Sequence, residues 1–292
     1  MYVPLLQRVF ETADKWTPSS RPERQSITVA ILSDLRRRVG SAPGAELLLA
    51  ATIRDAAILG VFTGSRVSEY AQGQLPAGQR FQRVPINAAS GAQGNHPISF
   101  EDEDFTFYSS AGIQTLSSVS HPAKYLRVRF RYTKGTARAF TYRMFASIPS
   151  SALCPIAAAS RVKLRWQTLC PGLHTPIFCY LPSMLTRKPF FLLDRHMTIA
   201  LRASLVRVYP NPRHILRQHA SSVSSHSLRV FACLCLKTAG WDEESISHQL
   251  RWNSDAVKFY IRQSLVQVDS VSSTVFCSAL TEDLPGQPKV IP

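Results

Sequence analysis

The chain has 292 residues, and 45% of them are hydrophobic, which is typical of a globular protein and excludes a disordered one. Thirty-four Lys and Arg residues stand against nineteen Asp and Glu, which leaves a formal net charge of +15. A surplus of this size favours a polyanionic partner, and nucleic acid is the usual one. A basic but otherwise ordinary surface is the plain alternative.

The sequence shows neither a membrane span nor a secretory leader. The longest apolar stretch, residues 45–60, is interrupted by Arg54 and Asp55, and residues 1–16 lack both a basic leader and a long apolar run. The six cysteines have no zinc-type spacing, and the chain is too long to need a disulfide framework. These features predict an intracellular protein that has no membrane partner, and whose cysteines are reduced thiols rather than zinc ligands or disulfides.

The first half of the chain begins with residues 1–25, a linker-like N-terminal segment. Ser26–Val39 predicts a helix, because Ser suits its start and the arginines suit the negative end of its macrodipole. Glu46–Leu59 predicts a strongly apolar, buried helix, which a break at Gly64 ends. Residues 73–97 are rich in Gly, Pro, Gln and Asn, and predict a long loop.

Alternation of apolar and polar residues predicts three strands in the middle of the chain. They are Asp104–Tyr108, Tyr125–Tyr132 and Ala137–Phe145. The last two flank Thr133–Thr136, a hairpin turn with Gly at the tight position. Lys134 is therefore expected near the tip of a hairpin in a small antiparallel sheet.

From Cys154 onward the chain has helical periodicity. The predicted helices are Pro155–Trp166, Thr198–Val208, Ser225–Thr238, Glu243–Leu250 and Asn253–Leu265. Residues 271–292 predict a weakly ordered tail. The predicted fold class is mainly α with a small antiparallel β-sheet, in one domain at residues 26–270.

Two arginines and a histidine suggest a phosphate site. The planar guanidinium groups of Arg66 and Arg229 can each make two parallel charge-assisted bonds to a phosphate. His226 precedes Arg229 by three positions, which places both on one helix face, where the imidazole can move a proton. Lys134 can protonate a leaving oxygen if neighbouring cations lower its pKa. Each residue alone also has an ordinary structural interpretation.

Tyr260 and Trp252 complete the candidate set. A tyrosine on an amphipathic segment is commonly a core residue, but a phenol can attack phosphorus where arginines lower its pKa. The indole N–H of Trp252 can donate to a phosphate oxygen. Basic residues on the predicted hairpin strands would contact the DNA backbone. They are Arg127, Arg129, Arg131 and Arg138.

The segments GSRVSEY, SHSLRV and RWNSDAVKFYIR resemble the signature segments of the tyrosine recombinases, the phage-integrase family. The family's catalytic set runs Arg, Lys, His-x-x-Arg, His or Trp, and Tyr. The residues that match it in order are Arg66, Lys134, His226, Arg229, Trp252 and Tyr260. Glu69 matches an acidic position that supports the family's site. The last segment is most similar to the recombinases of DIRS-type retrotransposons, and the resemblance covers about residues 45–265.

The chain departs from the family pattern at three points. Trp252 precedes Tyr260 by eight positions, one fewer than in many bacterial members. The predicted loop at 73–97 lies where the family usually passes quickly into its sheet. Residues 1–25 are too few to form the helical core-binding domain that normally precedes the catalytic one, so this chain is expected to be a fragment, a degraded copy or one piece of a polyprotein.

The resemblance implies the catalytic-domain fold of the DNA breaking-rejoining enzymes and a reaction without metal or cofactor. Tyr260 would attack the scissile phosphate and form a 3′-phosphotyrosine link, while Lys134 protonates the leaving 5′-oxygen. The two arginines would hold the non-bridging oxygens, His226 would act as acid and base, and Trp252 would position the phosphate. The implied function is site-specific DNA recombination or integration by a homotetramer on double-stranded DNA, in the nucleus if the retroelement likeness holds.

Three other interpretations remain open. The chain could be an inactive relic or a domesticated DNA-binding protein with a recombinase fold. It could be an enzyme like the type IB topoisomerases, which use the same chemistry to relax supercoils. It could also be a generic basic nucleic-acid-binding domain, in which case the six residues would not converge in space.

Overall fold

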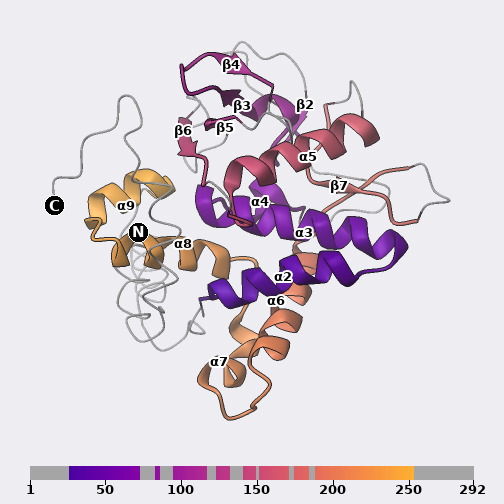
Figure 1. The fold of residues 1–292 in the computed structure, drawn as a ribbon, viewed down its shortest axis with the longest axis vertical. Helices are drawn as coiled ribbons and strands as arrows, with labels where there is room; N and C mark the ends of the chain where they lie inside the picture. Colours follow the sequence, from indigo (N-terminus) through magenta and orange to yellow (C-terminus); the bar gives the residue numbers. More distant parts are fainter. Residues whose placement is uncertain are drawn as a thin grey trace, which may run out of the picture.

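The computed structural model describes residues 26–72, 83–85, 95–116, 123–131, 141–148, 151–170, 174–183 and 188–252. These residues form a mixed fold in which helices predominate and a small antiparallel sheet lies at one end (Figure 1). This agrees with the predicted fold class in its coarse form. One hydrophobic core cluster includes residues from Ile27 to Trp252.

The described helices agree with the predicted ranges to within a few residues. They are α2 (Val29–Ser41), α3 (Gly44–Thr63), α4 (Val67–Tyr70), α5 (Pro155–Leu169), α6 (Asp194–Val208), α7 (Ile215–Gln218), α8 (Ser227–Thr238) and α9 (Glu243–Leu250), with 3-10 turns at Asp102–Asp104 and Ala220–Ser222. Helix α3 runs on to Thr63 because Gly64 ends it in the left-handed conformation. The short helix α4 lies where a new turn is expected to begin at Arg66, just after the break at Gly64. The short helix α7 was not predicted, since four residues carry too little periodicity.

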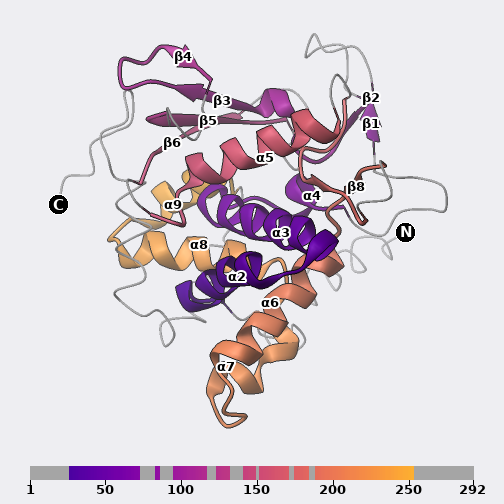
Figure 2. The ribbon, with the colours of Figure 1, turned by 45° about the vertical axis from the view of Figure 1, so that its right-hand side comes forward.

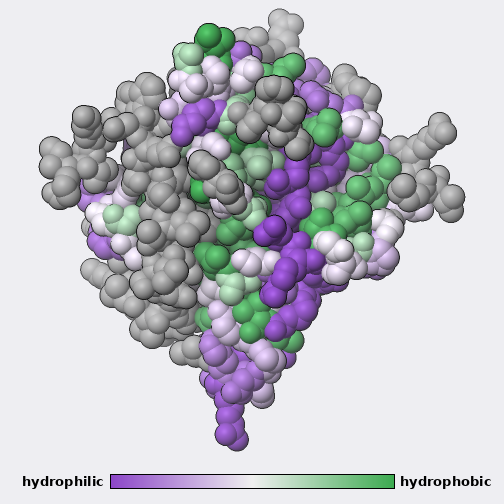
Figure 3. Space-filling model, in the orientation of Figure 1, coloured by the Kyte–Doolittle hydropathy of each residue, from purple (hydrophilic) through white to green (hydrophobic). Residues whose placement is uncertain are grey.

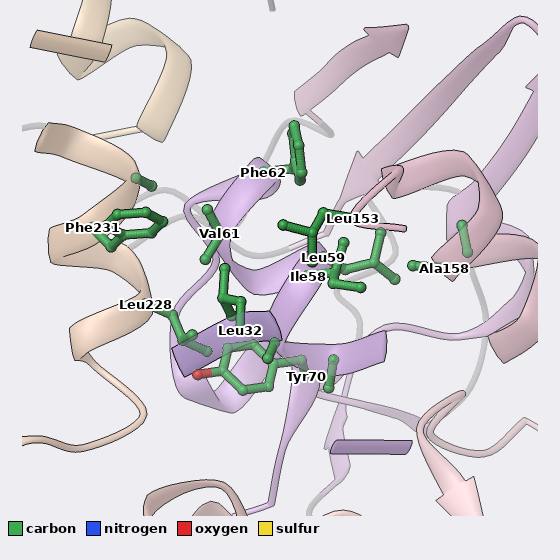
Figure 4. Packing of buried hydrophobic residues seen from close by; sticks show 14 of the residues in the cluster. Leu32, Ile58, Leu59, Val61, Phe62, Tyr70, Leu153, Ala158, Leu228 and Phe231 are labelled. Carbon is green, nitrogen blue, oxygen red and sulfur yellow. The ribbon is translucent and has the colours of Figure 1, made fainter. Parts of the chain in front are cut away.

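Helix α3 is the centre of the fold. It contacts α2, α5, α6 and α8, and Figure 2 shows it with α5 above and with α2 and α8 below. Its apolar side chains therefore pack in several directions, as Figure 4 shows for Ile58, Val61 and Phe62. All three are at most 3% exposed. This explains why the sequence of α3 is apolar on every side rather than amphipathic.

The main sheet has the strand order β4-β3-β5-β6, and every pair in it is antiparallel. Its strands are β3 (Phe105–Tyr108), β4 (Gln114–Thr115), β5 (Tyr125–Phe130) and β6 (Thr141–Ala146). Side chains of β5 alternate between buried and half-buried, as predicted. Phe130 pairs with Thr141, so the strands on either side of the predicted hairpin turn are in register.

The structure corrects the prediction of a featureless loop at residues 73–97. Strands β1 (Arg83–Pro85) and β2 (Asn95–Pro97) form an antiparallel ribbon there. Such short strands depend on backbone pairing, which Gly- and Pro-rich composition does not reveal. A second ribbon joins β7 (Cys179–Tyr180) to β8 (Phe190–Phe191).

Several predictions lie outside the described residues. They concern residues 1–25, the hairpin turn Thr133–Thr136, the helix Asn253–Leu265 and the tail 271–292. Within the described ranges, no helix has both the length and the apolar character that crossing a lipid bilayer would require.

Candidate active site

The candidate site begins where α3 gives way to α4. Gly64 has a φ of +55°, and a Cβ atom built on it would overlap the side chain of Leu250. This position requires a glycine, because glycine tolerates the positive φ and has no Cβ atom to collide with Leu250. Two residues later Arg66 is extended and half-buried, at the start of α4. The end of α9 is thus packed directly against the turn that presents Arg66.

Glu69 is the buried acid of the site, with 4% of its surface exposed. Its Oε2 accepts a 2.7 Å hydrogen bond from the backbone N–H of Arg66. Both carboxylate oxygens also accept from Arg251, at 2.8 Å from Nη1 to Oε1 and 2.9 Å from Nη2 to Oε2. Burial by itself would raise the pKa of Glu69, but the charge and hydrogen bonds of Arg251 outweigh it and hold this pKa below its ordinary value.

Arg251 joins the acid to the sheet. Its guanidinium carbon lies 3.5 Å from the centre of the Phe130 ring, at the end of β5. From β6, the Nη2 of Arg143 donates to the backbone carbonyl of His248 in α9. Both strands that flank the predicted Lys134 turn are therefore attached to the segment just before Trp252. Residues 132–140, which include Lys134, lie outside the described part of the chain.

Arg229 and Trp252 stack on each other. The guanidinium carbon of Arg229, in the first turn of α8, lies 4.7 Å from the centre of the Trp252 ring. Its Nη2 donates a 3.3 Å hydrogen bond to the carbonyl of Leu250. Both residues are 7% exposed. These contacts connect the second and third signature segments.

His226 lies at the N-terminus of α8 and is half-buried. The residue before it, Ser225, accepts a 3.0 Å hydrogen bond at its carbonyl from the hydroxyl of Tyr70 in α4. Close packing supports this contact, since a Cβ on Gly60 would lie 3.2 Å from Leu228 and 3.5 Å from the Tyr70 ring. The first and second signature segments are therefore also in direct contact.

The structure thus brings five of the predicted site residues into one connected region. They are Arg66, Glu69, His226, Arg229 and Trp252. Tyr260 and Lys134 lie outside the described residues. The sequence interpretation missed Arg251, although that residue stands directly before Trp252 in the third signature segment. Arg66 and Arg251 lie close to the one buried carboxylate, that of Glu69, and Arg229 packs on Trp252 next to Arg251. Three arginines and one acid give this region a positive balance, which suits an anion such as phosphate.

The predicted DNA-contacting arginines divide into different environments. Arg127 lies between two aromatic rings, 5.3 Å from the centre of Tyr108 and 5.1 Å from that of Tyr142. Arg129 is partly exposed and pairs with Asp104 and Glu103. Arg138 lies outside the described residues.

Arg131 does not fit the DNA-contact prediction. Its side chain is 3% exposed and pairs with Glu101 at 2.6 Å and with Asp104 at 2.9 Å. It also donates a 2.6 Å hydrogen bond to the carbonyl of Ser99. A buried guanidinium with three such partners cannot reach a backbone phosphate, so Arg131 is a structural residue that ties β5 to the turn before β3.

Metal-binding geometry is not found in the part of the chain that the structure describes, where no three His, Cys, Asp or Glu side chains form a ligand group. The described cysteines are all buried, and none lies among the site contacts given above. No protein-family model matches the chain, and no curated protein sequence is significantly similar to it. An assignment of function therefore depends on the signature residues and on the contacts between them.

Proposed function

We propose that this chain is the catalytic domain of a tyrosine recombinase, which cleaves and rejoins DNA through a 3′-phosphotyrosine intermediate. The observation that carries the proposal is the contact between three signature segments that are far apart in the sequence. Tyr70 of the first bonds to Ser225 of the second. Arg229 of the second stacks on Trp252 of the third, and Arg251 of the third pairs with Glu69 of the first.

The proposed mechanism gives each residue a task that its chemistry allows. Arg66 and Arg229 hold the non-bridging oxygens of the scissile phosphate and offset the charge that builds up during attack. The phenol oxygen of Tyr260 forms the new bond to phosphorus, and its proton passes to His226 or to water. The P–O5′ bond breaks, and Lys134 supplies a proton to the leaving 5′-oxygen. Attack by a 5′-hydroxyl reverses these steps and rejoins the strand.

The buried position of Arg229 suits this task. An arginine packed on an indole ring and bonded to a main-chain carbonyl has a fixed direction. Preorganised charge stabilises a transition state without reorganising during the reaction. Trp252 thereby acts mainly as the platform that orients Arg229.

The surface charge supports double-stranded DNA as the partner. Figure 3 shows a band of hydrophilic residues that crosses the face carrying α5, α3 and α2. Exposed arginines on α2 and on α6 add to the positive surface. They are Arg36, Arg37 and Arg38 on α2, and Arg195, Arg202 and Arg207 on α6. A homotetramer on DNA and residence in the nucleus belong to the same proposal.

The test is a search for a covalent protein–DNA adduct. The full chain is incubated with a pool of random-sequence duplexes that carry a nick near each candidate cleavage point, so that the released strand diffuses away and traps the intermediate. We expect an adduct that survives denaturing detergent and disappears in Tyr260→Phe. Tyr142→Phe is the control, because Tyr142 is 44% exposed on β6.

The adduct assay, together with an assay of supercoiled-plasmid relaxation, separates the competing functions. DNA binding without an adduct in wild-type protein would contradict the recombinase proposal and indicate a binding protein that retains the fold. Relaxation of a supercoiled plasmid without joining of two duplexes would indicate topoisomerase-like activity instead. An adduct that persists in Tyr260→Phe would show that another residue is the nucleophile.

A further inference from the structure

The carboxylate of Glu69 has two arginines near it, and it pairs with only one of them. Both of its oxygens accept from the side chain of Arg251, at 2.8 and 2.9 Å. From Arg66 it takes the backbone N–H, at 2.7 Å. Arg66 stands at the start of the short helix that carries Glu69, three residues before it. Its side-chain charge also lowers the pKa of Glu69, after the larger effects of burial, of Arg251 and of the Arg66 backbone N–H.

The backbone of Arg251 has a conformation that favours glycine, which indicates that the contacts of its side chain are needed there. Its φ is +58°, and it is the one non-glycine residue with positive φ in the described part of the chain. Glycine would adopt this conformation without strain, whereas any residue with a Cβ atom adopts it at a cost. The bidentate bond to Glu69 and the contact with Phe130 are interactions that a glycine could not make. The contacts with Glu69 and Phe130 therefore offset the strain of the left-handed backbone at Arg251.

We infer that Arg251 is a positioning residue that neutralises Glu69 and thereby keeps the guanidinium of Arg66 available for a phosphate oxygen. A buried carboxylate requires a cationic partner or a proton, because an unpaired buried charge is strongly unfavourable. Without Arg251, the nearby guanidinium of Arg66 would take that place. Of the two arginines that hold the phosphate in the proposed recombinase, only Arg229 would then remain available. The inference therefore rests on the proposed function.

A purely structural role for Arg251 makes a different prediction. If Arg251 only stabilises the fold, Arg251→Met lowers stability, but the folded variant binds phosphate as tightly as wild type. If Arg251 keeps Arg66 free, removal of the carboxylate as well leaves nothing to capture Arg66. Anion binding then returns in the double variant, which is the result that separates the two roles.

The experiment measures the affinity of inorganic phosphate for the full chain by isothermal titration calorimetry. The variants are Arg66→Ala, Arg251→Met, Glu69→Gln, and Arg251→Met combined with Glu69→Gln. Methionine keeps most of the arginine stem and the same Cβ strain. We expect Arg66→Ala and Arg251→Met each to weaken phosphate binding about tenfold, as the loss of one charge-assisted bond would. The double variant is expected to recover to within about threefold of wild type.

Stability is measured on every variant, with Arg165→Met as the matched control. Arg165 is 11% exposed and pairs with the fully buried Asp55, away from the site, so its loss should leave phosphate affinity unchanged. If Arg251→Met does not fold, Arg251→Gly, which relieves the positive φ, replaces it in both the single and the double variant.

Two results would overturn the inference. One is a phosphate affinity that is unchanged in Arg251→Met, or that is lowered there and not restored in the double variant. The other is phosphate binding in wild type that does not depend on Arg66. The proposed function fails separately: absence of a Tyr260 adduct, together with the expected phosphate pattern, would remove the recombinase reaction and leave the role of Arg251 standing.

Discussion

The hydroxyl of Tyr70 donates a 3.0 Å hydrogen bond to the backbone carbonyl of Ser225, 155 residues away in the sequence. Tyr70 ends α4, whose first turn follows Arg66, and Ser225 immediately precedes His226. Because the ring is 1% exposed and packs beside Gly60, the bond has little freedom. The buried Tyr70 side chain thus fixes the distance between the segment that carries Arg66 and the start of α8.

We expect Tyr70→Phe to lower the free energy of unfolding by about 1–2 kcal/mol, because the Ser225 carbonyl loses its donor in a buried place. The ring packing should be kept, so the variant should fold. Urea denaturation of Tyr70→Phe and of the exposed Tyr142→Phe measures the difference. Equal stability of the two variants would show that the Tyr70 hydroxyl is not engaged.

The sequence predicted the helices and strands well where periodicity is strong. Helix α9 has the predicted bounds, and α3 and β5 differ only at their ends. The signature residues also predicted which segments would meet, since Arg229 and Trp252 are in contact. The partner of Glu69 could not be predicted, because a left-handed arginine at 251 has no local sequence signal. The burial of Arg131 was missed for a related reason. Alternation gives the face of a strand, but it does not reveal acids from another segment that cover that face.

Gly64 and Gly112 form a matched pair for separating backbone strain from steric overlap. Both have positive φ, but a Cβ on Gly112 has nothing within 4 Å, whereas one on Gly64 would overlap Leu250. We expect Gly112→Ala to cost about 1 kcal/mol of stability, from the left-handed conformation alone. Gly64→Ala should cost at least about 2 kcal/mol, since overpacking adds to that strain. Thermal denaturation of both variants gives the comparison.

Gly64→Ala should also displace the carbonyl of Leu250 to which Arg229 donates. Phosphate affinity should therefore fall in Gly64→Ala and stay unchanged in Gly112→Ala. Similar stability losses with unchanged phosphate binding in both would contradict the proposed coupling between the Gly64 turn and Arg229.

Glu69 and Asp104 should affect the pH dependence of stability in opposite directions. The folded pKa of Glu69 lies below the ordinary value of a glutamate, so the unfolded chain binds its proton more tightly. Its contribution to stability is then present above about pH 4.5 and is lost as the pH falls through the folded pKa. Burial raises the pKa of Asp104, although Arg131 and Arg129 oppose the shift, so its contribution declines as the pH rises.

Urea denaturation between about pH 3 and pH 7 tests both signs. The stability advantage of wild type over Glu69→Gln should shrink toward acid, because Glu69 becomes protonated in both states. The advantage over Asp104→Asn should instead grow toward acid. The same trend in both variants would show that one of the two directions is wrong.

Asp55 should be the most sensitive charged residue outside the candidate site. It is fully buried on α3, and its carboxylate accepts from Arg54 at 2.8 Å, from Arg161 at 2.8 and 3.0 Å, and from Arg165 at 2.9 Å. Asp55→Asn would leave three guanidinium groups facing one another in a partly buried place. We expect it to lower the free energy of unfolding by about 3–5 kcal/mol, the usual cost of removing one member of a buried ion pair.

Arg161→Met is the comparison for Asp55→Asn, because 33% of the Arg161 side chain is exposed and the carboxylate keeps its other two partners. Its loss should cost less than about 1 kcal/mol, since solvent screens such a pair. Three arginines surround this one carboxylate, so the cluster has more positive than negative charge. Burial lowers the pKa of Arg54, and the charges of Arg161 and Arg165 add to this shift, while Asp55 opposes it. If Asp55→Asn were no more costly than Arg161→Met, the carboxylate would not be what holds α3 against α5.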